Sequence, residues 1–152
     1  MEKIDRMLAE WECTSLSHAF AHHLDHRDYA GLARLFTPDG VWIRHGQSLR
    51  GREQIVAALE KRPPNQFTRH VTTGFHFTHL DATTAKSIAY NISYFSLDGT
   101  DLPLRYVPDQ AMVLDFIDQY VRTQDGWRFS ERLTKEVLIP DAVRAILAAQ
   151  KH

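Results

Sequence analysis

Ser-Ile-Ala-Tyr-Asn-Ile-Ser-Tyr, residues 87–94, alternates small or polar side chains with bulky apolar ones. A period of two residues is typical of a β-strand, because successive side chains point to opposite faces of a sheet. Two orientations are open at this point. The small face (Ser87, Ala89, Asn91, Ser93) can turn toward covering helices and leave room for a cavity, and the bulky face then needs a second subunit. Alternatively, the bulky face (Ile88, Tyr90, Ile92, Tyr94) packs into the core and the small face meets water.

The rest of the second half is also predicted to be sheet. Phe75 and Phe77 alternate with polar residues, and long strands are expected near 110–122 and 127–138. The dipeptides Asp98-Gly99 and Asp125-Gly126 are typical of hairpin turns. We therefore expect an antiparallel meander. After Pro140, a short amphipathic closing helix is expected, with its apolar positions at Val143, Ile146 and Leu147.

The first half has the period of helices. Cys13, Leu16, Phe20 and Leu24 recur at three- and four-residue steps, which predicts a helix over roughly residues 3–26. The next elements expected are a short helix near 28–36, a turn at 37–40 (Thr-Pro-Asp-Gly), a short strand at 41–43 and a helix over 51–62. This order predicts an α+β fold in which helices cover one face of a curved sheet.

Composition narrows the class of protein. The chain has 152 residues and a formal charge of −1, which predicts one domain over residues 1–152. The balanced charge argues against a partner that is a nucleic acid or a membrane surface. A single cysteine excludes an internal disulfide and every multi-cysteine zinc motif. The first residues lack an apolar signal core, and no apolar run reaches membrane-spanning length, so we expect a cytoplasmic protein.

Asp25 and His70 are the most suggestive pair of titratable residues. Asp25 falls at the end of the first predicted helix, and His70 falls at the start of the first long strand. A carboxylate that accepts one imidazole N–H fixes the tautomer and makes the other ring nitrogen more basic. Such a pair can take a proton from carbon. The alternative is that the two residues, far apart in sequence, are unrelated.

Metal binding is a competing hypothesis for the first helix. His18, His22 and Asp25 fall on one side of it, at i, i+4 and i+7, and resemble a facial metal triad. The plainer interpretation is a partly solvated helix flank, because such triads usually draw ligands from more than one element. We expect no metal and, since no Gly-rich phosphate loop is present, no nucleotide cofactor.

Three segments carry a family resemblance that covers nearly the whole chain. They are residues 21–29 (Ala-His-His-Leu-Asp-His-Arg-Asp-Tyr), 68–73 (Thr-Arg-His-Val-Thr-Thr) and 125–129 (Asp-Gly-Trp-Arg-Phe), the last followed by Arg132. Together they resemble the SnoaL-like branch of the nuclear-transport-factor-2-like superfamily. The resemblance implies a cone-like barrel of a curved, mostly antiparallel sheet, with helices that cover its concave face and enclose a pocket. Many unrelated functions share this fold.

Within that superfamily, the motifs are nearest to those of scytalone dehydratase and hexachlorocyclohexane dehydrochlorinase. This likeness implies that Asp25 and His70 form a catalytic dyad and that Trp42 and Arg132 belong to the pocket. Asn91 stands where the dehydratase has a second histidine. Leu24 and Arg44 stand where it has tyrosines, so scytalone itself is not the expected substrate.

The function predicted on this basis is that of a cofactor-free lyase, of dehydratase or β-elimination type, acting on a small cyclic or aromatic molecule. Arg44, Asn91 and Arg132 are expected to hold the oxygen or leaving group that gains charge. The expected apolar walls are Phe20, Trp42, Met112, Leu114 and Phe116. The alternatives are a double-bond isomerase with the same dyad, or a non-catalytic ligand-binding or assembly module like a dioxygenase small subunit. We expect a homo-oligomer, a dimer or trimer, formed through the outer face of the sheet.

Overall fold

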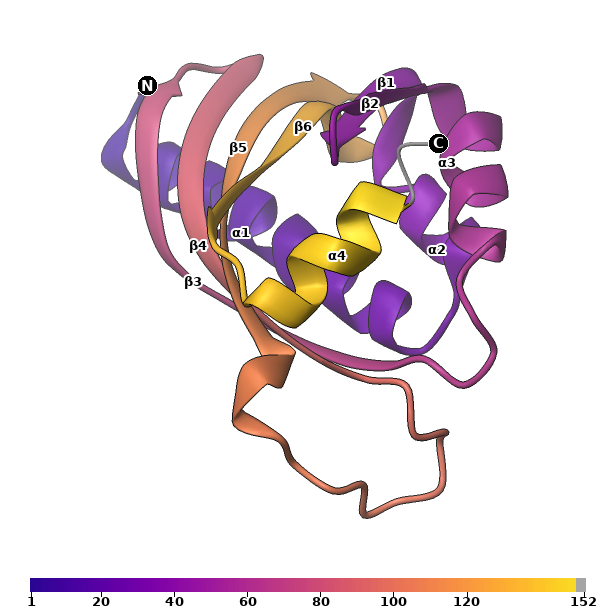
Figure 1. Ribbon diagram of the computed structural model, residues 1–152. Coiled ribbons are helices and arrows are strands. Elements are labelled where there is room, and N and C mark those ends of the chain that lie inside the picture. Colours follow the sequence, from indigo (N-terminus) through magenta and orange to yellow (C-terminus); the bar gives the residue numbers. More distant parts are fainter. Residues whose placement is uncertain (150–152) are drawn as a thin grey trace.

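The computed structural model of the protein describes residues 1–149 (Figure 1). The helices are α1 (Lys3–Asp25), α2 (Tyr29–Ala33), α3 (Gly51–Glu60), α4 (Asp141–Ala149) and the short 3₁₀ helix η1 (Pro108–Gln110). The strands are β1 (Phe36–Arg44), β2 (Gln47–Arg50), β3 (Phe67–Leu80), β4 (Thr84–Ser96), β5 (Ala111–Thr123) and β6 (Gly126–Leu138). The side chain of Ile146, which the sequence placed on the apolar side of the closing helix, lies outside the described part.

The six strands form one curved sheet in the order β2-β1-β6-β5-β4-β3 (Figure 1). Among the strands of residues 1–149, only the β1–β6 pair is parallel; the other pairings are antiparallel. This confirms the predicted α+β class and the mostly antiparallel sheet. The sheet does not close into a barrel, because β2 and β3 are its two edges.

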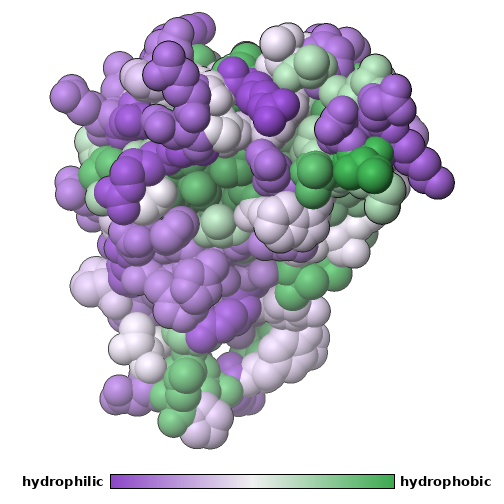
Figure 2. Space-filling model, turned by 180° about the vertical axis from the view of Figure 1, so that it is seen from behind, coloured by the Kyte–Doolittle hydropathy of each residue, from purple (hydrophilic) through white to green (hydrophobic). Residues whose placement is uncertain are grey.

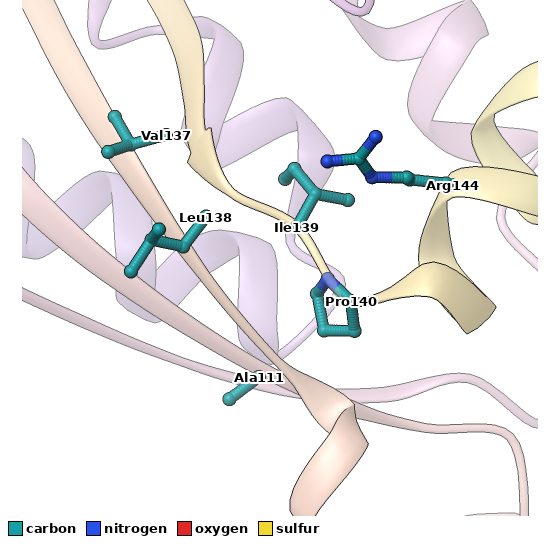
Figure 3. A pocket seen from close by; sticks show the side chains of 6 residues that line it. All are labelled: Ala111, Val137, Leu138, Ile139, Pro140 and Arg144. Carbon is teal, nitrogen blue, oxygen red and sulfur yellow. The ribbon is translucent and has the colours of Figure 1, made fainter.

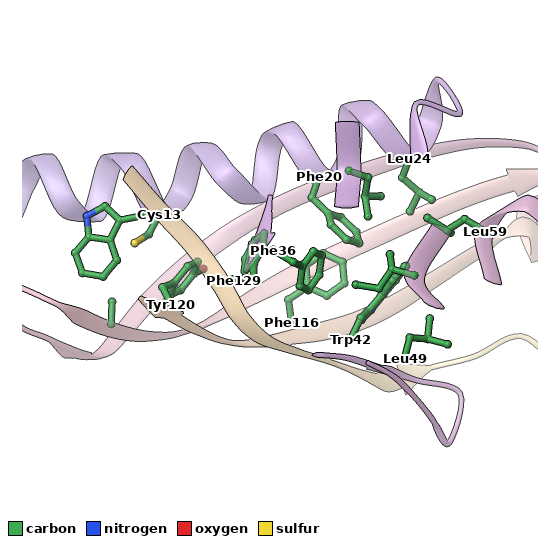
Figure 4. Close-up of a cluster of buried hydrophobic side chains, with 14 of the residues drawn as sticks. Cys13, Phe20, Leu24, Phe36, Trp42, Leu49, Leu59, Phe116, Tyr120 and Phe129 are labelled. Atoms are coloured by element: carbon green, nitrogen blue, oxygen red, sulfur yellow. The ribbon is translucent and has the colours of Figure 1, made fainter. Parts of the chain in front are cut away.

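Helix α1 packs along one face of the sheet, which we call the inner face, and the apolar core lies between them (Figure 4). The small side chains of β4 point to this face: Ser87, Ala89, Asn91 and Ser93 are all buried. On the other side, Tyr90 is 57% exposed and Tyr94 is 38% exposed. The first of the two orientations is therefore confirmed, and the alternative, with the bulky face in the core, is wrong.

Two predicted turns are wrong. Residues 37–40 do not end a helix but lie inside β1, where the register against β6 shifts between Phe36 and Val41. A bulge absorbs these turn-forming residues, and the Thr37 hydroxyl donates to the Asp39 carboxylate within it. The dipeptide at 98–99 is not a hairpin either, because residues 97–110 form a long connection. Its start is tied to the loop before β3, since the Gly99 amide donates to the Asn65 carbonyl.

Other predicted boundaries of helices and strands agree more closely with the structure. The helices predicted over 3–26 and 51–62 correspond to α1 and α3, and the hairpin at Asp125-Gly126 joins β5 to β6. Strand β1 is longer than the predicted 41–43, and β2 was not predicted.

Figure 2 shows hydrophobic groups at several places on the surface among hydrophilic ones, including the projecting 97–110 connection, where Leu102 and Tyr106 are exposed.

Candidate active site

Asp25 and His70 are in direct contact. Asp25 is the last residue of α1 and His70 lies in β3. The carboxylate Oδ1 is 2.5 Å from His70 Nδ1, and Oδ2 accepts the backbone N–H of His70 at 2.9 Å. The side chains are only 6% and 10% exposed. The end of α1 is therefore fixed to β3 through one carboxylate that holds both the ring and the backbone of the histidine.

A second layer of hydrogen bonds orients that carboxylate. The Thr68 hydroxyl donates to Asp25 Oδ1 at 2.9 Å and accepts from Arg62 Nη2 at 3.0 Å. Arg62 also donates to the Leu24 carbonyl at 2.8 Å, at the end of α1. Burial by itself raises the pKa of Asp25, but the hydrogen bonds and charge of His70 and the bond from Thr68 outweigh it and hold this pKa below its ordinary value.

This geometry determines the tautomer of His70. An ionised Asp25 can only accept, so Nδ1 carries the ring proton and Nε2 presents its lone pair in the neutral ring. The hydroxyl of Ser93, on β4, lies 2.9 Å from Nε2 and donates to it. The basic nitrogen thus faces the inner side of the sheet and is held by one hydroxyl that can rotate away.

Arg132 forms a buried ion pair, and its expected contact with substrate stays a prediction. Its Nε and Nη2 donate to the two oxygens of Asp118, at 2.8 and 2.7 Å, and Nη2 also donates to Ser17. The guanidinium lies 4.0–4.3 Å from the ring centres of three phenylalanines. Of the three guanidinium nitrogens of Arg132, Nη1 is buried without a hydrogen-bond partner in the described structure. This group was a candidate from the sequence, but its carboxylate partner on β5 was not identified.

The predicted apolar walls lie mainly within the core. Phe20 contacts Trp42 and Phe116 edge-on, at ring-centre distances of 5.0 and 5.9 Å. Leu114 is buried, and Met112 is partly buried beside Ser93 on the neighbouring strand. Phe20, Trp42 and Phe116 therefore pack against one another as core side chains. Whether they also line a ligand pocket stays a prediction.

Asn91 lies on the inner face next to the dyad. It is two residues before Ser93 on β4, and its Nδ2 donates to Thr72 on β3 at 2.9 Å. Its Oδ1 is buried and has no partner within the described structure. An unsatisfied buried carbonyl oxygen is costly, so a ligand hydroxyl or amine, or a water, would stabilise it.

Arg44 lies at the end of β1 with its guanidinium carbon 4.4 Å above the Trp42 ring. Burial, with the nearby positive charge of Arg62, lowers the pKa of Arg44 to about 10. Arg62 was not identified from the sequence, because its role depends on how the loop after α3 returns to the end of α1. No local motif marks it.

The three residues of the suggested metal triad do not gather around one point. His18 packs edge-on against Phe75, His22 stacks on His26, and Asp25 is turned to His70. Across residues 1–149 no group of three or more His, Cys, Asp or Glu side chains is placed to hold an ion.

Two hollows open on the surface away from the dyad. One, of about 300 Å³, lies where β6 passes into α4 and is lined by Ala111, Val137, Leu138, Ile139, Pro140 and Arg144 (Figure 3). The other, of about 350 Å³, lies between α1 and β3, with Met7, Trp11, Phe75 and Phe77 among its lining residues. Neither is lined by Asp25 or His70.

The protein has a curved sheet crossed by one long helix, and a buried Asp–His pair lies where that helix ends. These features place it in a class of small α+β proteins. The family model of the SnoaL-like domain matches residues 5–133, and the chain belongs to this family. No curated protein sequence matches the chain significantly. None of the described helices is long and apolar enough to cross a membrane.

Solved structures share the fold at low sequence identity. One is a protein from Novosphingobium aromaticivorans provisionally named scytalone dehydratase (TM-score 0.76, 17% identity, 90% of this chain and 89% of that chain). A protein of unknown function from Mycobacterium tuberculosis is also similar (TM-score 0.77, 18% identity, 98% and 92%). A hexachlorocyclohexane dehydrochlorinase is a third (TM-score 0.71, 17% identity, 89% of each chain).

Proposed function

We propose that the protein is a cofactor-independent lyase of the dehydratase or β-elimination type, which acts on a small cyclic or aromatic molecule. The observation that carries this proposal is the contact between Asp25 and His70, 2.5 Å from carboxylate to Nδ1. It orients a buried imidazole with its basic nitrogen toward the inner face, as a general base for carbon requires. Two structures of similar fold are named for a dehydratase and a dehydrochlorinase, and this agrees with an elimination.

In the proposed reaction, the Ser93 hydroxyl turns away and His70 Nε2 takes a proton from the carbon next to an electron-withdrawing group. The imidazolium that forms is stabilised by the Asp25 carboxylate. The electron pair of the broken C–H bond forms the new double bond as the leaving group departs from the neighbouring carbon. Asn91 and Arg44 are placed in this proposal near the oxygen or leaving group that gains charge. Low exposure of the dyad strengthens each of these electrostatic contacts.

Replacement of His70 by alanine tests the base directly. A suitable probe is a bicyclic β-hydroxyketone that becomes a fluorescent naphthol when it loses water, incubated with the protein in deuterium oxide. We expect the wild-type protein to accelerate both deuterium exchange at the acidic carbon and naphthol formation. His70→Ala should lower these rates by roughly 10²- to 10⁴-fold, the usual contribution of one general base.

His76→Ala is the matched control, because His76 is an exposed histidine on the same strand. It should keep the wild-type rates, and circular dichroism should show that both variants are folded. Exchange without naphthol formation would favour an isomerase, which begins with the same proton removal. If neither rate exceeds that of buffer, or if His70→Ala is as active as wild type, the dyad is not a catalytic base for this class of substrate.

A further inference from the structure

Several arginines lie close together where α1 ends, and the described carboxylates do not neutralise their positive charges. Arg27 and Arg62 both donate to the Tyr29 hydroxyl, at 3.3 and 3.4 Å, and Arg44 lies within the electrostatic reach of Arg62 and Tyr29. The remaining hydrogen bonds of Arg27 and Arg62 go to neutral oxygens, the carbonyls of Pro63, Gln66 and Leu24 and the Thr68 hydroxyl. The nearby carboxylate of Asp25 is directed to His70.

Arg44 differs from the other two in having no partner for its donors. Within residues 1–149 its side chain has no ion pair and no hydrogen bond, and its guanidinium lies over the face of Trp42. A guanidinium carries five N–H donors in a planar fork that matches a carboxylate. Its lowered pKa shows that burial and the charge of Arg62 already oppose the cation there. An incoming anion would offset the repulsion from Arg62 and give the partly buried cation a counter-charge.

Hydrogen bonds fix the position of Arg62, whose charge acts on Arg44, relative to the dyad. Arg62 Nη2 reaches the Thr68 hydroxyl at 3.0 Å, and that hydroxyl reaches Asp25 Oδ1 at 2.9 Å. A group bound between Arg44 and Arg62 therefore lies near the Asp25 end of the pair. We propose that Arg44, with Arg62 behind it, binds an anionic oxygen group of the substrate, of the carboxylate class. This rests on the proposed function, because it assigns a charge to the substrate of the same site.

The buried arginine of β6 does not compete for this role. Asp118 already neutralises Arg132 through two hydrogen bonds, so Arg132 offers an incoming carboxylate the two N–H groups of Nη1 and little net charge. Of the two arginines that the sequence singled out, Arg44 is the one whose charge remains available.

Benzoate and benzamide form a matched pair of probes, since they have the same shape and differ in charge. Binding to the wild-type protein is measured by calorimetry or by NMR titration. We expect benzoate to bind at least tenfold more tightly than benzamide. Arg44→Gln should weaken benzoate binding roughly ten- to a hundredfold, as loss of charge-assisted hydrogen bonds does. Arg44→Lys keeps the charge without the fork and should give an intermediate affinity, so the test still holds if the glutamine variant fails to fold.

Arg69→Gln is the control. The guanidinium of Arg69 also lies 4.4 Å over an aromatic ring, that of Phe67, but it is exposed to solvent. It should leave benzoate affinity unchanged. Equal affinity for benzoate and benzamide, no measurable benzoate binding, or full affinity in both Arg44 variants would overturn the assignment.

His70→Ala separates this inference from the proposed function. That variant should still bind benzoate although it has lost proton abstraction. A protein that binds benzoate but never exchanges carbon-bound protons would refute the lyase and keep the anion site. A protein that performs the elimination on neutral substrates with no preference for anions would support the lyase and refute the anion site.

Discussion

At the scale of single residues, Arg132 and Asp118 form a buried ion pair that is costly to break. Both are completely buried, and their charges are compensated by each other. Asp118→Ala would leave the Arg132 cation buried without a counter-charge, and we expect a loss of about 3–5 kcal/mol in the free energy of unfolding. Urea denaturation at neutral pH measures this. Asp115→Ala, on the outer face of the same strand, should cost less than about 1 kcal/mol.

The double variant Asp118→Leu/Arg132→Met completes that experiment. The two apolar residues remove both charges together, so this variant should be markedly more stable than Asp118→Ala. If Asp118→Ala costs no more than Asp115→Ala, the guanidinium must be able to leave the pair. In that case Arg132 would again be a candidate for substrate binding.

The sequence identified Asp25 and His70 through a family resemblance, and their spacing alone left the pairing undecided. Asp118 and Arg62 could not be found in the same way. Their importance depends on which strand or loop lies opposite them: Asp118 pairs with Arg132 only through the β5–β6 register, and Arg62 reaches Thr68 only because the chain turns back after α3. Burial of Arg132 likewise follows from three rings contributed by different elements.

At the scale of elements, Gly74 lies at an irregularity in the pairing of β3 with β4. It has a positive φ of 66° at the point where the β3–β4 register shifts. A Cβ added there would meet the Tyr90 ring at 2.7 Å. Gly74→Ala should therefore lower the free energy of unfolding by roughly 1–3 kcal/mol, from backbone strain and the contact together. Thermal or urea unfolding provides the measurement.

Gly99 offers a control for the backbone part of that effect. Its φ is 101°, also positive, and an added Cβ would have nothing within 4 Å. Gly99→Ala should cost less than Gly74→Ala, and Tyr90→Ala should recover part of the difference in the Gly74→Ala background. Equal costs at the two glycines would show that the Tyr90 contact is unimportant.

The predictions of helices and strands were most accurate where apolar residues recur regularly over a long segment and only that side of the element is buried. Helix α1 and strands β4 to β6 have this property, and their boundaries agree with the prediction within a few residues. The predictions failed at short segments whose residue types are typical of turns. Thr37-Pro38-Asp39-Gly40 was absorbed into a bulge of β1, because its neighbours pair with β2 and β6. Pairing with strands distant in sequence thus overrode local turn chemistry.

At the scale of the whole molecule, an apolar row crosses the outer face of the sheet. The strand register places Val71, Ile92, Val113 and Leu138 next to one another on β3, β4, β5 and β6, and Tyr90 and Tyr94 stand beside them. Val71 is 49% exposed and Leu138 is 64% exposed. A contiguous apolar surface of this kind is typical of a subunit interface. We predict that the protein is a dimer or trimer formed through this face.

Sedimentation of the purified protein tests the prediction. A pair of substitutions, Val71→Lys and Tyr90→Lys, places charges in the middle of the row and should shift the protein to monomers without unfolding it, because both side chains already contact solvent. Ile4→Lys, at an exposed residue of α1 on the inner side of the sheet, should leave the assembly intact. A wild-type protein that sediments as a monomer at high concentration would contradict the prediction, and the exposed row would then need another partner.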